Sequence, residues 1–136
     1  GLHGQTEDRT AADEVAQFAD QQPTPIPLKE ILEMRQTSEL QQVLQRELPV
    51  RLANRIAHLD LLPEIHRVEQ LVAVRANFVQ SFREIREATK ADASPEAFAR
   101  VIEALTERHK HQASLFSLGM REWRQLRESQ GFPEAE

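Results

Sequence analysis

The segment from Leu44 to Pro63, LQRELPVRLANRIAHLDLLP, constrains the fold more than any other part of this chain. Its apolar residues recur at steps of three or four, which is the period of one helix face: Leu44, Leu48, Leu52, Ile56 and Leu59. Pro49 lies inside this pattern, lacks an N–H and crowds the carbonyl of Gln45. We therefore expect a long helix from about Ser38 that kinks at Pro49 and depends on tertiary packing for its stability.

Two further long helices are predicted after Pro63. The first runs from Glu64 to Ala88, with Pro63 at its opening turn. The second starts at Ser94, an N-cap residue followed by Pro95 and the acidic Glu96. Its apolar stripe is expected to continue without a break through Phe98, Val101, Ile102, Leu105, His109, Ala113, Phe116, Met120 and Trp123. No strand pattern occurs, so the sequence predicts an all-α antiparallel helical bundle.

The residues before the first long helix predict smaller elements. Residues 10–19 favour a short helix with Val15 and Phe18 on one side, and the prolines of QQPTPIP predict an extended connector. A short amphipathic helix is expected around Leu28, Ile31, Leu32 and Met34. We divide the chain into a mostly flexible extension (1–22), a bundle domain (23–128) and a flexible tail (129–136).

Composition excludes several classes of function. A net charge of −5 argues against nucleic-acid binding, which needs clustered basic residues. No segment has the length and apolarity of a membrane span, and the absence of cysteine removes thiolate chemistry. The chain has four glycines and neither a phosphate-binding glycine loop nor an HExxH motif. We therefore expect no catalytic residue, metal site or bound cofactor in these residues.

Three polar residues fall on or beside the predicted apolar stripes. His109 interrupts the last stripe, where a buried imidazole needs a partner or loses its charge. A satisfied core histidine is the commoner explanation, and perturbed groups indicate function only in a minority of cases. Arg75 and Ser81 interrupt the preceding stripe, and Ser81 either lines a cavity or bonds back to the carbonyl of Phe78 or Asn77.

The chain resembles the N-terminal domain of the mitochondrial 2-oxoacid dehydrogenase kinases, with the pyruvate dehydrogenase kinases as the nearest match and the branched-chain kinase also compatible. The resemblance is carried by LxxELPxRLAxRIxxLxxLP, by TPIPLKEILEMRQ, by NFVQSF at residues 77–82 and by RHK at residues 108–110. These segments keep the order and spacing of the family, and the similarity extends from about Pro25 to Trp123.

This resemblance implies two binding regions. The family bundle docks the lipoyl domain of the dehydrogenase acyltransferase core, at positions that match Ile31, Met34, Val43 and Leu44. Family members also bind small 2-oxoacids or halogenated acetates inside the bundle, at positions that match Leu52, Phe78, Ser81, Thr106 and His109. There a protonated His109 would pair with the carboxylate. Phe78 stands where a tyrosine is usual, and Thr106 where some members have an arginine.

The resemblance also implies a mitochondrial matrix protein whose kinase activity, with ATP and magnesium, belongs to a catalytic domain that this chain lacks. The chain alone is expected to be inactive. It also ends before the fourth long helix of the family bundle, so an exposed groove would be covered by repacking, by a homo-oligomer or by the rest of the protein. Two alternatives stay open: a stand-alone adaptor without kinase activity, and a structural helical module.

Overall fold

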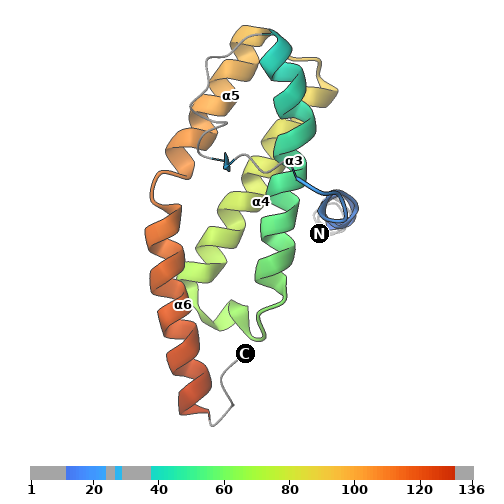
Figure 1. Ribbon diagram of the computed structural model, residues 1–136. Helices are drawn as coiled ribbons and strands as arrows, with labels where there is room; N and C mark the ends of the chain where they lie inside the picture. Colours follow the sequence, from blue (N-terminus) through green and yellow to red (C-terminus); the bar gives the residue numbers. More distant parts are fainter. Residues whose placement is uncertain (1–11, 24–26, 29–37, 131–136) are drawn as a thin grey trace, which may run out of the picture.

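The computed structural model describes residues 12–23, 27–28 and 38–130, and this part of the chain contains helices and no strand. Figure 1 shows α3 (Ser38–Asp60) beside α4 (Glu69–Lys90), with the short 3-10 helix η1 (Ile65–Arg67) between them in the chain. The chain then returns along α4 as α5 (Pro95–Arg108) and α6 (Gln112–Ser129). The predicted all-α helical bundle is confirmed.

Three clusters of buried apolar side chains follow one another along the bundle. The upper cluster joins α3, α4 and α5 through Leu44, Leu48, Ile85, Ala88, Phe98, Ile102 and Leu105. The middle cluster joins residues 12–19, α3 and α4 through Val15, Leu52, Ala53, Ile56 and Phe82. The lower cluster joins the start of α4 to α6 through Val68, Leu71 and Trp123. The core therefore consists of three clusters spaced along the bundle.

The apolar face predicted for α3 is its buried face. Its five residues are at most 4% exposed: Leu44, Leu48, Leu52, Ile56 and Leu59. The helix runs through Pro49, which is itself buried. Because proline removes one backbone hydrogen bond, packing on α4 and α5 has to offset that loss. The N-cap of α5 is also as predicted: the Ser94 side chain accepts a hydrogen bond from the Ala97 N–H at 3.2 Å.

The prediction that the second long helix begins at Glu64 is wrong. Glu64 has a φ of 59°, in the left-handed region, which an α-helix cannot pass through. The η1 turn follows, Val68 is extended, and α4 begins only at Glu69. Pro63 therefore does not open α4. Its carbonyl instead accepts a hydrogen bond from the indole N–H of Trp123 at 2.9 Å.

The prediction of one unbroken helix from Pro95 to beyond Trp123 is also wrong. The α5 helix ends at Arg108, and α6 begins at Gln112 after a turn at residues 109–111. The break turns a different side of α6 towards the core: Gln112, Gly119 and Trp123 are buried, whereas Phe116 is 40% exposed. Gly119 permits this packing because a Cβ there would lie 2.7 Å from Cδ2 of Leu71.

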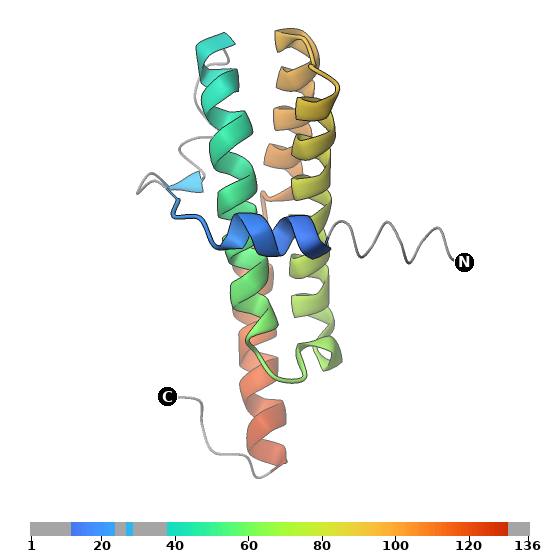
Figure 2. The same ribbon diagram turned by 90° about the vertical axis from the view of Figure 1, so that its right-hand side faces the viewer.

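Residues 12–19 form the short helix predicted around Val15 and Phe18, called here the N-terminal helix. Figure 2 shows it crossing α3 and α4 nearly at right angles. Val15 belongs to the middle cluster, so this helix packs on the bundle. The amphipathic helix predicted around Ile31, Leu32 and Met34 lies outside the described residues. None of the described helices is long and apolar enough to cross a membrane.

Candidate functional site

A partly buried polar network lies between α4 and the junction of α5 with α6. Ser81 is fully buried on α4, and His109 caps the C-terminus of α5. Ser81 Oγ lies 2.7 Å from His109 Nε2. Arg108 donates from Nη1 to Ser81 Oγ at 2.9 Å and from Nη2 to Glu84 Oε1 at 3.0 Å. One hydroxyl group thus connects a guanidinium group with an imidazole ring.

Ser81 contacts Arg108 and His109 through one hydroxyl group. Because arginine can only donate, Ser81 Oγ accepts from Arg108. Its contact with His109 Nε2 runs in the direction set by the tautomer of the ring: the hydroxyl donates to a bare Nε2 or accepts from an Nε2–H group. Burial, together with the positive charge of Arg108, lowers the pKa of His109 to about 4. The ring is therefore neutral at pH 7.

The Nδ1 atom of His109 is buried and has no hydrogen-bond partner within the described part of the chain. A buried polar nitrogen without a hydrogen-bond partner is unfavourable in a folded protein, and most such atoms are paired. Phe78 stacks on the ring, with centroids 5.3 Å apart and planes inclined by 29°. The site therefore offers one unpaired ring nitrogen beside the Phe78 ring.

The structure brings together most of the residues predicted for an internal pocket. Ser81 and Phe78 both contact His109. Leu52 is fully buried in the middle cluster, against which Phe78 also packs. Thr106 does not join them, because its side chain is exposed and its hydroxyl donates to the carbonyl of Ile102 at 2.8 Å.

Sequence reasoning missed the roles of Arg108 and Glu84. Their places in the sequence are the only signal for these roles. Arg108 directly precedes His109, and Glu84 follows Ser81 by three residues, which places Ser81 and Glu84 on one face of α4. The two charges are joined across α4 and α5. They hold the end of α5, and with it His109, against Ser81.

A second polar contact fixes the start of α6 close to the site. Asn77 Nδ2 donates to Oε1 of Gln112 at 2.8 Å, and Gln112 Nε2 donates to the carbonyl of Val74 at 3.3 Å. Gln112 is 8% exposed, so its amide needs both partners. The turn that carries His109 is thereby held on α4 from both sides. Arg75 lies outside this arrangement and forms a bidentate pair with Asp60 at 2.6 and 3.1 Å.

Of the residues predicted to dock a lipoyl group, the structure describes Val43 and Leu44. Val43 is 40% exposed, whereas Leu44 is fully buried in the upper cluster. Adjacent residues of a helix point about 100° apart, so burial of one is compatible with exposure of the other. Ile31 and Met34 lie outside the described residues.

Comparison with known proteins points to one family. A family model described as mitochondrial branched-chain alpha-ketoacid dehydrogenase kinase matches residues 14–132. This range includes the Ser81, Arg108 and His109 network and extends through α6. No curated protein matches the chain.

Proposed function

Because the chain belongs to the mitochondrial branched-chain alpha-ketoacid dehydrogenase kinase family, we propose that it is the N-terminal regulatory bundle of such a kinase and binds a small carboxylic acid beside His109. The observation that carries this proposal is the buried Nδ1 of His109, which lacks an acceptor among the described residues. In the Nδ1–H tautomer, a carboxylate oxygen is the acceptor that would satisfy this atom.

The protonation state in this proposal differs from that expected from the sequence. We propose that His109 acts as a neutral donor through Nδ1–H, with the Ser81 hydroxyl donating to Nε2, in keeping with a pKa of about 4. Arg108, which is paired with Glu84, lies on the same network. A bound anion next to the imidazole favours the imidazolium form and would raise the pKa of His109.

The surroundings favour a short acid with an apolar or halogenated substituent. The Phe78 ring stacks on the imidazole, and Leu52 belongs to the cluster against which Phe78 packs. Apolar walls with one directed polar group are typical of small-molecule sites. A small 2-oxoacid or dichloroacetate fits this chemistry.

Dichloroacetate tests the site directly. We expect it to raise the melting temperature of the full chain, since a ligand that binds only the folded state stabilises it. His109→Ala should abolish that increase. His111→Ala is the matched control, because His111 is exposed two residues away. An equal increase in the His109 variant would contradict binding beside His109.

We further propose that the bundle docks the lipoyl domain of the dehydrogenase acyltransferase core, with exposed Val43 in the contact. Val43→Asp should weaken binding of a lipoylated domain, and Gln42→Asp, at an exposed neighbour, should weaken it much less. Equal effects would place the docking surface elsewhere. No binding to a folded chain would favour the structural-module alternative.

In this proposal the chain itself binds and regulates, and the family's kinase chemistry belongs to a domain outside these residues. That domain would use ATP and magnesium to phosphorylate the dehydrogenase. The proposed compartment is the mitochondrial matrix, in line with the mitochondrial family.

A further inference from the structure

The N-terminal helix and the walls of the acid site pack against the same apolar cluster. The middle cluster combines Val15 of the N-terminal helix with Leu52 of α3 and Phe82 of α4. Phe18 packs against it from the N-terminal helix, and Phe78 packs against it from α4. Phe82 also directly follows Ser81 in the chain. A rearrangement of these side chains would therefore change the packing of both the proposed acid site and the N-terminal helix.

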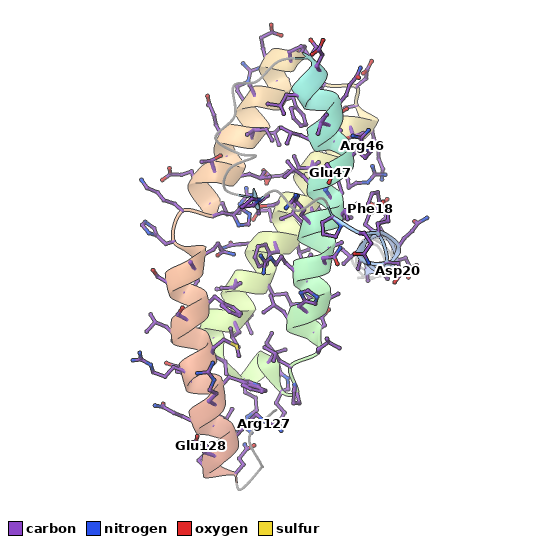
Figure 3. The ribbon with its side chains drawn as sticks, viewed as in Figure 1. Phe18, Asp20, Arg46, Glu47, Arg127 and Glu128 are labelled. Atoms are coloured by element: carbon purple, nitrogen blue, oxygen red, sulfur yellow. The ribbon has the colours of Figure 1, made fainter. Side chains whose placement is uncertain are left out.

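A small set of side chains holds the N-terminal helix in place. Phe18 meets the Phe82 ring edge-on, with centroids 5.7 Å apart, and the guanidinium of Arg86 lies 4.9 Å from the centre of the Phe18 ring. Glu14 accepts a hydrogen bond from Lys90 at 2.8 Å and lies 3.6 Å from Arg86. The Lys90 hydrogen bond is the main cause of the lowered pKa of Glu14. Figure 3 shows Phe18 on the side of its helix that faces α3.

Next to these contacts, the N-terminal helix borders an open groove of about 520 Å³. Val15 lines this groove together with Ala12, Ala16 and Ala19 of the same helix, and Ala57 and Val79 line it from the bundle. The contact of this helix with the bundle is therefore incomplete along the alanine side. Because short isolated helices are marginal in water, this helix depends on the contacts of its packed side.

We infer that docking of the N-terminal helix is coupled to occupation of the acid site through the middle cluster. The inference rests on the proposed function of that site. An acid beside His109 restrains Phe78, which stacks on the imidazole, and thereby orders the cluster on which Phe18 and Val15 pack. By thermodynamic linkage, docking of the helix must raise the affinity for the acid by the same factor by which bound acid raises the equilibrium constant for docking.

Hydrogen exchange of the full chain measures the docking. In the wild type, saturating dichloroacetate should slow amide exchange in residues 12–19 by about 5-fold, the lower end of typical coupling factors. His109→Ala should lose this protection. Phe18→Ala should undock the helix and weaken dichloroacetate binding by the same factor. Gln17→Ala, an exposed position on the same helix, should leave the affinity unchanged.

The outcomes separate this inference from the proposed function. Dichloroacetate binding that depends on His109 but leaves exchange in residues 12–19 unaltered would overturn the coupling and keep the site. No dichloroacetate binding at all would overturn both. If Phe18→Ala fails to fold, Glu14→Gln replaces it, because this change loosens the N-terminal helix from outside the middle cluster. Faster amide exchange in residues 12–19 would show that the helix is loosened. An unaltered affinity for dichloroacetate in that variant would then overturn the coupling.

Discussion

Ser81 Oγ and His109 Nε2 lie 2.7 Å apart, and Arg108 donates to the same hydroxyl oxygen. In the tautomer that we propose, Ser81 donates its own proton to Nε2 and the ring proton resides on Nδ1. The Nδ1 atom is buried and has no hydrogen-bond partner in the described residues. The proposed acid site is therefore this ring nitrogen, beside the Phe78 ring.

Ser81→Ala should lower the free energy of unfolding by about 1 to 3 kcal/mol, the cost of leaving buried polar groups unpaired. The affected groups are Nε2 of His109 and Nη1 of Arg108. Urea denaturation followed by the fluorescence of Trp123, the chain's one tryptophan, measures the change. Ser117→Ala, at an exposed position of α6, should stay within about 0.5 kcal/mol of the wild type. A matching small loss at Ser81 would mean that the network is not formed.

The low pKa of His109 predicts a specific pH dependence. The pKa rises from about 4 in the folded state to the ordinary value of 6.5 in the unfolded chain. The unfolded state therefore binds more protons between these pH values. The contribution of neutral His109 to stability is complete above pH 6.5 and is lost as the pH falls towards 4. The wild type should lose more unfolding free energy from pH 7 to pH 5 than His109→Gln does. His58→Gln, at an exposed site, should behave like the wild type.

Leu52→Ala should lower the free energy of unfolding by about 2 to 5 kcal/mol through loss of apolar contacts and formation of a cavity. Leu52 is fully buried in the middle cluster, which supports both the acid site and the N-terminal helix. Leu61→Ala provides the comparison, since Leu61 is 78% exposed. Similar losses at both positions in chemical denaturation would contradict the assigned burial.

Gly119→Ala should destabilise the protein by about 1 to 3 kcal/mol, although glycine to alanine inside a helix ordinarily stabilises it. The added Cβ would lie 2.7 Å from Cδ2 and 2.8 Å from Cγ of Leu71, whose side chain is fully buried and would have to shift within the core. Thermal unfolding gives the sign of the change. A stabilised variant would show that α6 does not pack this closely on α4.

The period of apolar residues predicts burial correctly where apolar residues alone decide which helix face is buried. The buried face of α3 from Leu44 to Leu59 was predicted correctly for this reason. The start of α5 was predicted from local chemistry, the N-cap Ser94 followed by Pro95. The turn at residues 109–111 escaped prediction because apolar residues continue at helical steps across it. Burial of Gln112 and Gly119 decides the orientation of α6, and neither residue contributes to an apolar pattern.

The candidate site was predicted in part, through resemblance to a family rather than through periodicity. Ser81 and Phe78 do contact His109, across 28 residues of sequence in the case of Ser81. The pairing of Glu84 with Arg108 depends on how α5 lies on α4, which no local pattern encodes. The contact of Phe18 with Phe82 is equally long-range, so the docked N-terminal helix was not foreseen as part of the bundle.

Nitrogen and proton NMR of the His109 imidazole tests the central claim most directly. At pH 7 without ligand, we predict a protonated Nδ1 and an unprotonated Nε2. Added dichloroacetate should shift the Nδ1–H resonance downfield as a carboxylate accepts its hydrogen bond, with Ser81 retained on Nε2. A proton on Nε2 in the free protein, or an Nδ1–H resonance unchanged at saturating dichloroacetate, would contradict an acid site at His109.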